Sequence, residues 1–259
     1  NAAPNIFSRA GLRVRGRSSK GFPKKNYRLE LWDDETEQDR KIPLLGMPAD
    51  GDWVLHGPWG YDDAYLHNAF IYALGRQLGA WAPRTEFVEM FLNSNGGKLD
   101  WQDYVGVYVV VERIESGKDR LDITEIEPQD NAGDALTGGY IFKWDEPDPD
   151  EIAWKTNRGI PSEDSSLIIV EPDSDEVTEE QLDYLKTTIQ RFEDALFADA
   201  SRNFATRDYL KFIDRASWID FHIINFFAFN PDAVRLSTYF HKDRNGKIKC
   251  GPLWDFDRT

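Results

Sequence analysis

The apolar residues of this chain change their spacing along its length. In the first half they alternate with polar residues, as in Leu12 to Arg15 and Tyr27 to Leu31, and this period of two is typical of strands. After Thr178 they recur every three or four residues, which is the spacing of an amphipathic helix. This order of patterns predicts an α+β fold, with a sheet-rich first part and a mainly helical last part.

Three helices and several more strands are predicted. The first helix runs from Asp63 to Gly79, and the capping-box pattern Thr178-Glu179-Glu180-Gln181 begins the second. The third covers Ser217 to Phe229 and is apolar on most sides, so we expect it to be buried. Strands are predicted at residues 87–92, 105–111, 140–144 and 167–170.

Composition excludes several classes of protein. The 259 residues fit one large domain or two lobes, and the formal charge of −15 argues against a nucleic-acid binder. The longest strongly apolar stretches, 106–111 and 219–229, fall short of the 18 or more residues that a membrane span needs. We therefore expect no nucleic-acid partner and no membrane span in this segment.

Charge is distributed unevenly along the chain. Residues 1–28 contain eight Lys and Arg and no acid, so their +8 leaves −23 on residues 29–259. A basic segment within an acidic protein attracts a compact anion such as phosphate better than a long polyanion. A solvated strand hairpin explains the basic segment equally well on charge alone.

The most acidic stretch runs from Asp145 to Asp183 and is punctuated by prolines. We interpret it as a solvated connection between two lobes. Calcium binding is the alternative, but the stretch lacks the D-x-[DN]-x-[DN]-G loop pattern.

Three aspartates flank a predicted hairpin near the end of the chain. Asn245-Gly246 marks its turn, and if its arms pair about the centre of that turn, Asp232 falls opposite Asp257 and close to Asp255. Opposed residues on paired strands have Cβ atoms roughly 5 Å apart, near enough for carboxylates to share a magnesium ion. Isolated aspartates at a sheet edge more often cap turns. Because three of them converge here, we predict a metal site.

Several short motifs follow one another in a fixed order along nearly the whole chain. They are Arg15-Gly16-Arg17-Ser18-Ser19, Phe22 to Leu29, Asp52-Trp53-Val54-Leu55, Gly106 to Ile114, Thr137 to Lys143, Asn230-Pro231-Asp232, Arg235 to Tyr239 and Gly251 to Asp257. With this combination the chain resembles the spore-coat protein H (CotH) family of atypical, protein-kinase-like enzymes. Several motifs in the right order are far more specific than any one of them.

The resemblance implies a single, two-lobed, atypical protein-kinase-like domain over residues 1–259. Its sheet-rich N-lobe would cover about 1–145, an acidic connection 146–177 and a mainly helical C-lobe 178–259, and we expect the protein to continue beyond Thr259. The implied activity is ATP- and magnesium-dependent phosphoryl transfer to Ser or Thr hydroxyls, with manganese as an alternative metal. The implied protein substrates belong to coats or cell surfaces outside the cytoplasm.

The resemblance also implies roles for individual residues. Asp232 resembles the catalytic-loop aspartate of protein kinases, and Asp255 resembles the magnesium-binding aspartate of D-F-G, with Asp257 as a second ligand. Ser237 stands where kinases place a second metal ligand. The remaining residues with an implied role form a phosphate cradle, made of Arg15, Arg17, Ser18 and Ser19 with Lys24 or Lys25, and Glu112 pairs with the lysine. Of the two lysines, Lys25 is slightly favoured.

Several of these residues have ordinary structural explanations. The lysines fit solvated strand charges, the serines fit turn formers, and Glu112 fits an exposed strand residue equally well. The sequence also departs from the kinase pattern. Asn230-Pro231-Asp232 stands in place of an H-R-D triplet, Ser237 replaces an asparagine, and no glycine-rich nucleotide motif is present.

Two other interpretations therefore stay open. In one, a catalytically weak or inactive kinase-like module binds a nucleotide or partner during surface assembly. In the other, the nine tryptophans form sugar-stacking platforms, although most of them lie in core-like patterns. This last interpretation is the least favoured.

Overall fold

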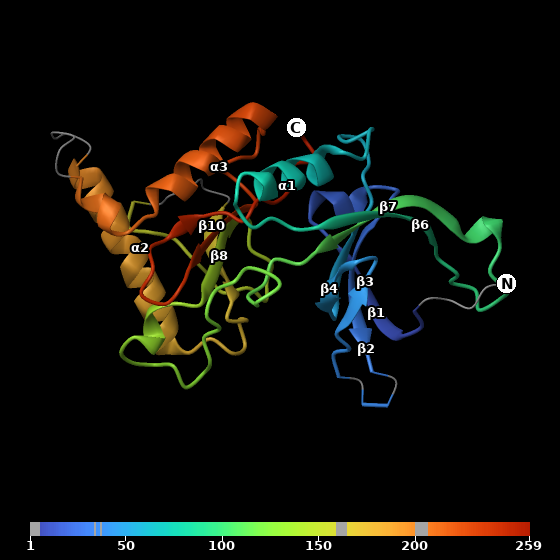
Figure 1. Ribbon diagram of the computed structural model, residues 1–259, viewed down its shortest axis with the longest axis horizontal. Helices are drawn as coiled ribbons and strands as arrows, with labels where there is room; N and C mark the ends of the chain where they lie inside the picture. The colour runs from blue at the N-terminus through green and yellow to red at the C-terminus, as the bar shows by residue number, and fades with distance from the viewer. Residues whose placement is uncertain (1–5, 34, 37, 159–164, 200–206) are drawn as a thin grey trace. The chain divides into compact units, whose positions relative to one another are not determined.

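The computed structural model describes residues 6–33, 35–36, 38–158, 165–199 and 207–259. It is an α+β structure, as predicted, and divides into two compact units (Figure 1). Unit 1 comprises Asn1–Phe70 and Pro83–Arg113, and unit 2 comprises Ile71–Ala82 and Ile114–Thr259. The lobe boundary predicted after residue 145 falls inside unit 2. The predicted acidic connection contains strands there, while its residues 159–164 lie outside the described ranges.

Unit 1 is built on a five-stranded antiparallel sheet with the order β1-β2-β5-β7-β6. Its strands are β1 (Arg9–Arg15), β2 (Asn26–Trp32), β5 (Asp52–His56), β6 (Thr85–Phe91) and β7 (Tyr104–Glu112), and a separate hairpin is formed by β3 (Ile42–Leu44) and β4 (Met47–Asp50). Trp53, Tyr108 and Leu31 are buried at its core. The strands predicted around Leu12, Leu29, Phe87 and Val107 are thus confirmed.

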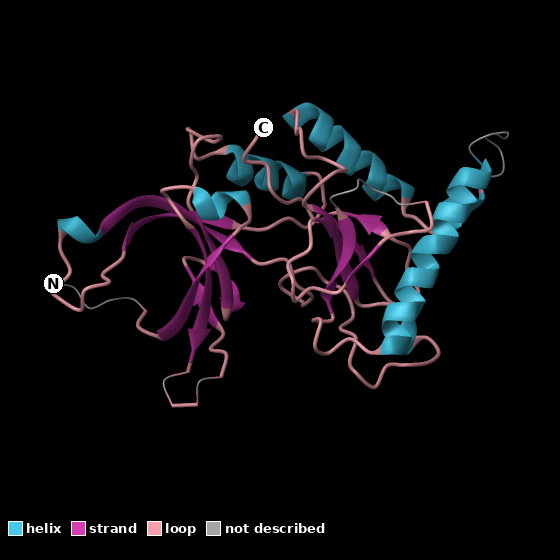
Figure 2. Cartoon of the chain, turned by 180° about the vertical axis from the view of Figure 1, so that it is seen from behind, coloured by secondary structure: helices cyan, strands magenta, loops and turns pink. Residues whose placement is uncertain are grey.

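Unit 2 contains a second five-stranded antiparallel sheet, of order β12-β11-β8-β10-β9. Its strands are β8 (Tyr140–Asp145), β9 (Ala153–Trp154), β10 (Ser166–Glu171), β11 (Thr238–Lys242) and β12 (Lys249–Cys250). The strands predicted at 140–144 and 167–170 are confirmed as β8 and β10. Figure 2 shows strands and helices side by side in this unit, so the last part of the chain is less purely helical than expected.

The three predicted helices are present as α1 (His67–Gln77), α2 (Glu179–Asp199) and α3 (Arg215–Ala228). The capping box at the start of α2 is formed in both directions. The Gln181 N–H donates to Thr178 Oγ1 at 3.3 Å, and the Thr178 N–H donates to Gln181 Oε1 at 3.1 Å. Among the described residues, no helix is both long and apolar enough to cross a membrane.

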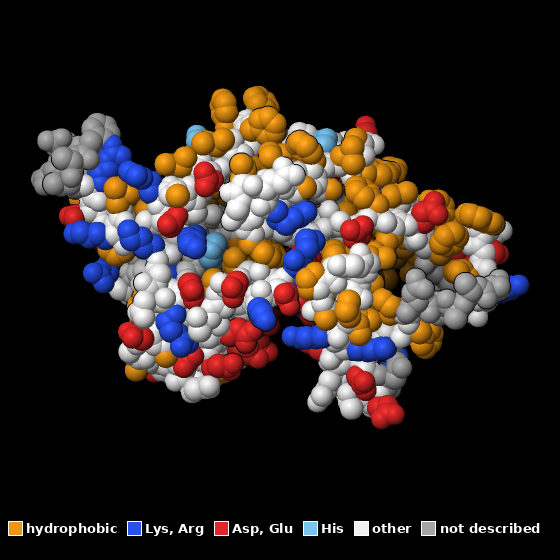
Figure 3. Space-filling model, viewed as in Figure 1, with side chains coloured by type: hydrophobic (Ala, Val, Ile, Leu, Met, Phe, Trp, Pro, Cys, Tyr) orange, Lys and Arg blue, Asp and Glu red, His pale blue; other side chains and the backbone are white. Residues whose placement is uncertain are grey.

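The expectation that the third helix is buried is wrong. In α3 the buried residues are Phe221, Ile224 and Asn225, whereas Phe226 is 78% exposed and Phe227 is 65% exposed. Figure 3 shows hydrophobic side chains gathered at the surface over this helix. The helix is apolar on most sides, but the described part of unit 2 covers only one of its faces.

Candidate active site

Asp145 and Ser237 meet at the end of the central strands of the unit 2 sheet. β8 and β11 are antiparallel, and Trp144 pairs with Thr238, so Asp145 and Ser237 occupy the next opposed positions. The Ser237 Oγ atom lies 3.3 Å from Asp145 Oδ2. Asp145 is the first residue of the acidic stretch 145–183, which the sequence suggested to be a solvated connection. In the structure Asp145 is the last residue of β8, and its position directly after the predicted strand 140–144 was the sequence signal for this role.

Ser237 also contacts the predicted metal motif, by which we mean Asp255-Phe256-Asp257. Its Oγ atom lies 3.0 Å from Oδ2 of Asp255. Asp255 stands between two aromatic anchors of unit 2, since Trp254 stacks on Tyr72 with centroids 6.1 Å apart and buried Phe256 meets the same ring edge-on. The backbone N–H of Asp255 donates to the Tyr72 hydroxyl at 3.1 Å. These contacts fix the position of the Asp255 backbone.

Asp257 completes the acidic cluster, by which we mean Asp145, Asp232, Asp255 and Asp257. Burial raises the pKa of Asp257 to about 7, and the charge of Asp255, a hydrogen bond to Asp255 and the charge of Asp232 add to this effect. Burial also raises the pKa of Asp145, with a further contribution from the charge of Asp255. Carboxylates this close repel one another, and a bound cation would relieve that repulsion.

Asp232 lies in the turn after α3 and is held by two arginines. Its Oδ1 accepts from Arg235 Nη2 at 2.6 Å, and Arg258 Nη1 lies 3.0 Å from Oδ1 and 2.9 Å from Oδ2. The backbone N–H of Asp232 donates to Oδ1 of Asn230 in the same turn at 3.0 Å. The side chain of Asn230 thus shapes the turn that presents the aspartate.

The charges of Asp232 and Asp255 both act on Asp257, so the three aspartates lie near one another, but the predicted strand register is wrong. The ladder pairs Phe240 with Cys250 and His241 with Lys249, which is one residue away from the expected register. β12 is only two residues long, because Pro252 has no N–H to continue the ladder. Asp232 and Asp257 consequently lie in turns rather than opposite each other on strands.

The predicted phosphate cradle belongs to unit 1 and is formed by the loop after β1. Gly16 has a φ of 95°, and a Cβ atom there would lie 2.0 Å from the Ser19 hydroxyl oxygen. Ser18 and Ser19 begin a short 3-10 turn, Ser18–Gly21. Only glycine allows this close approach, so the Ser19 side chain and the loop backbone at Gly16 pack directly together.

The two candidate lysines have different environments. Lys24 Nζ donates to the Val107 carbonyl of β7 and lies over the rings of Tyr65 and Tyr108, 4.4 and 4.9 Å from their centroids. Burial lowers the pKa of Lys24. Lys25 Nζ instead donates to the Lys20 carbonyl of its own loop at 2.7 Å. Lys24 is therefore the lysine directed onto the sheet, although Lys25 was slightly favoured from sequence.

The positive charges of Arg15 and Lys24 both affect the pKa of His56, the last residue of β5. Burial lowers the pKa of His56 to about 4, and the positive charges of Arg15 and Lys24 lower it further. The structure thus brings two of the predicted cradle residues near one partly buried imidazole.

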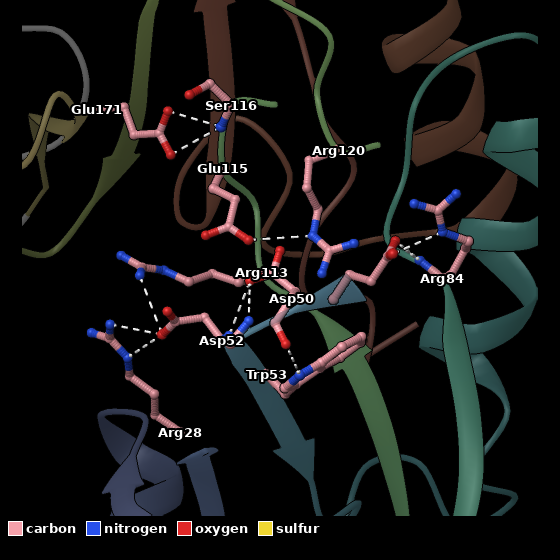
Figure 4. A network of polar contacts seen from close by, with 12 residues as sticks. Arg28, Asp50, Asp52, Trp53, Arg84, Arg113, Glu115, Ser116, Arg120 and Glu171 are labelled. Atoms are coloured by element: carbon pink, nitrogen blue, oxygen red, sulfur yellow. Dashed lines mark hydrogen bonds and ion pairs between the residues drawn. The ribbon is translucent and has the colours of Figure 1, made fainter. Parts of the chain in front are cut away.

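Glu112, the last residue of β7, does not pair with either candidate lysine as predicted. Its fully buried carboxylate accepts from the backbone N–H and the Nε atom of Arg84, both at 2.8 Å. A neighbouring part of the same unit contains Asp52, which is contacted by Arg28 at 2.9 Å and Arg113 at 3.5 Å (Figure 4). Glu112 and Asp52 are thus both paired with arginines.

Comparison with known families agrees with the motifs. The model of a family described as CotH kinase protein matches residues 12–259, which is nearly the whole chain. A comparison with curated proteins finds no match.

Proposed function

Because the chain belongs to the CotH kinase family, we propose that it transfers the γ-phosphoryl group of ATP to Ser or Thr hydroxyls of proteins. The acidic cluster around Ser237 is the observation that carries the proposal. Its oxygen donors are mainly carboxylates, which are the ligands that magnesium and manganese prefer, and the hydroxyl of Ser237 lies within hydrogen-bond distance of two of them. The donor set therefore fits the metal that such a reaction needs.

We assign metal binding to Asp255 and Asp257 in unit 2. Bound magnesium would neutralise charge on the phosphate oxygens during transfer. The aromatic anchors on both sides of Asp255 hold the backbone of this residue in place before the metal arrives. Ser237 shares a hydrogen bond with Asp255 and limits its rotation.

Asp232 is the proposed catalytic residue. It would orient the acceptor hydroxyl and take its proton, while the hydroxyl oxygen bonds to the γ-phosphorus and the bond to the departing ADP oxygen breaks. An acceptor hydroxyl would replace one of the arginine contacts of Asp232. Arg235 and Arg258 would then provide positive charge close to the transferred group.

Phosphate binding is assigned to unit 1. The loop of Arg15, Arg17, Ser18 and Ser19 supplies guanidinium and hydroxyl donors, and Lys24 supplies an amine directed onto the sheet. Lys25 is the alternative lysine. The proposal makes units 1 and 2 the sheet-rich lobe and the catalytic lobe of a kinase-like fold. Its substrates would be coat or surface proteins outside the cytoplasm, as the family resemblance implies.

The decisive experiment measures transfer of radiolabel from γ-labelled ATP, with magnesium or manganese, to a generic protein acceptor and to the enzyme itself. We expect incorporation by the wild type and by Asp150→Asn, an exposed control with the same loss of charge. Asp232→Asn should lose at least a hundredfold of the rate yet keep nucleotide binding. Asp255→Asn should lose magnesium-dependent stabilisation by nucleotide. Equal transfer by the wild type and Asp232→Asn would refute the assignment.

A second candidate function is a kinase-like module that binds nucleotide without turning it over. The two arginines on Asp232 favour it, because they occupy the carboxylate that should receive the acceptor hydroxyl. Its signature is metal-dependent nucleotide binding with no label transfer by any variant. Activity gained in Arg258→Met would show that the arginine contact restrains an otherwise competent site.

A further inference from the structure

We propose that Asp145, rather than Ser237, supplies the protein oxygen for a second metal ion, and that Ser237 positions the Asp145 carboxylate. The inference rests on the proposed kinase function and names a residue that the kinase pattern does not include. Ser237 stands where protein kinases have a metal-binding asparagine, and in this proposal Asp145 supplies the ligand oxygen in its place.

Ser237 stands at the position where protein kinases have a ligand for the second metal ion. In protein kinases the two magnesium ions are held by the D-F-G aspartate and by an asparagine five residues after the catalytic aspartate. Here that fifth position after Asp232 is Ser237. A serine hydroxyl is shorter than an asparagine side chain and a weaker ligand for a hard cation than a carboxylate or carboxamide oxygen. Another side chain must supply the oxygen if two ions bind.

Asp145 reaches the place where that oxygen is needed. The pairing of Trp144 with Thr238 sets Asp145 directly across from Ser237. One hydroxyl, Ser237 Oγ, lies within hydrogen-bond distance of both Asp145 Oδ2, at 3.3 Å, and Asp255 Oδ2, at 3.0 Å. The carboxylate on β8 and the carboxylate of the metal motif therefore lie on either side of Ser237.

Each carboxylate oxygen of Asp145 has a hydrogen-bond partner and can still coordinate a cation. Its Oδ1 accepts from the N–H of Glu146 at 2.9 Å, and Ser237 contacts its Oδ2. An ionised carboxylate has about four acceptor sites, so lone pairs remain on both oxygens. Nearby, the amine of Lys143 is bound to Glu151 Oε1 at 2.6 Å. That pairing partly neutralises the closest lysine on the same strand.

A hydroxyl between two carboxylates cannot neutralise both of them. Ser237 has one proton and donates it to one acid at a time. Two ionised acids brought together in this way favour a cation between or beside them. Ser237 thus acts as a positioning residue, in the way that partners behind metal ligands commonly do.

The test counts bound manganese with the paramagnetic resonance signal of free Mn²⁺, in the presence of a non-hydrolysable ATP analogue. We expect two ions per wild-type chain and one per Asp145→Asn chain. Ser237→Ala should keep both ions but bind the second about 10–100-fold more weakly. Asp150→Asn, which removes an exposed acid from the same segment, should match the wild type. Thermal unfolding without metal reports whether each variant folds.

Several results would contradict the role of Asp145 at a second metal site and would leave the proposed kinase function unaffected. Two ions of unchanged affinity in Asp145→Asn would exclude Asp145 as a ligand, and a single ion in the wild type would exclude the second site. If Asp145→Asn fails to fold, Ser237→Ala decides, because unchanged affinity there would contradict the positioning role. By contrast, no nucleotide-dependent manganese binding by the wild type would overturn the proposed function itself.

Discussion

The hydroxyl of Ser237 lies 3.0 Å from Oδ2 of Asp255, although 18 residues separate them along the chain. Both residues have positive φ, 49° for Ser237 and 62° for Asp255. Such conformations cost on the order of 1–3 kcal/mol each in residues other than glycine, so surrounding contacts must maintain them. The hydroxyl of Tyr72 is one of these contacts, since it accepts the Asp255 N–H.

Removal of that hydroxyl should loosen the metal motif. Tyr72→Phe keeps the ring that stacks on Trp254 but leaves the Asp255 N–H without this acceptor, at a cost of about 1–3 kcal/mol in unfolding free energy. We expect manganese and nucleotide to bind several-fold more weakly, measured by calorimetry. Tyr184→Phe, a matched change on α2 in the same unit, should leave metal affinity unchanged. Equal metal affinity in Tyr72→Phe and the wild type would show that this bond does not position Asp255.

Asp257 should make the metal-free protein less stable as pH rises. Its pKa is raised from 3.8 to about 7 in the folded protein, so the folded state binds more protons than the unfolded chain between these values. The contribution of Asp257 to stability is therefore fully present below about pH 4 and is lost as pH rises through about 7. Asp257→Asn should abolish this part of the pH dependence.

Thermal unfolding in a chelator between pH 4 and 8 measures the effect as the difference between wild type and variant. Magnesium should reverse the trend in the wild type, because it favours the ionised carboxylate. A difference that does not change with pH would contradict the raised pKa of Asp257.

His56 can report which lysine belongs to the phosphate cradle. Its pKa is about 4, and the charge of Lys24 contributes to lowering it. Lys24→Met should therefore raise the pKa of His56, whereas Lys25→Met should leave it unchanged. Inorganic phosphate or ATP bound near Arg15 and Lys24 should raise it as well, since an anion offsets their charge. The titration is followed by the NMR shifts of the histidine rings, and a His56 pKa insensitive to nucleotide would place the phosphates elsewhere.

Local patterns in the sequence predicted most of the elements. Period-two alternation found strands β1 and β2, and the capping box found the start of α2, because both depend on neighbouring residues. The exposure of Phe226 on α3 could not be predicted in this way. Periodicity shows which residues are apolar, but it does not show whether another element covers them.

The candidate site was predicted in part. The gathering of Asp232, Asp255 and Asp257 was expected, yet their arrangement depends on turns and on a ladder that ends at Pro252 rather than on an extended hairpin. Asp145 was missed because 92 residues separate it from Ser237, and only the pairing of β8 with β11 brings them together. Nothing in the sequence alone states which distant strands are neighbours.

Gly16 provides the sharpest test of the phosphate loop. Its φ of 95° is unfavourable for any residue with a Cβ atom, and that atom would lie 2.0 Å from Ser19 Oγ. Gly16→Ala should therefore force the Ser19 side chain away and change the loop backbone, at a cost of about 1–3 kcal/mol in stability. We expect nucleotide affinity to fall at least tenfold, by calorimetry.

Gly21 in the same loop is the matched control. A Cβ atom at Gly21 has no heavy atom within 4 Å, so Gly21→Ala should change neither stability nor affinity by much. The two variants alter composition identically and differ only in the space and backbone angle at the substituted residue. Unchanged nucleotide affinity in Gly16→Ala, with the expected loss of stability, would show that the loop is structural and that the phosphates bind to another part of unit 1.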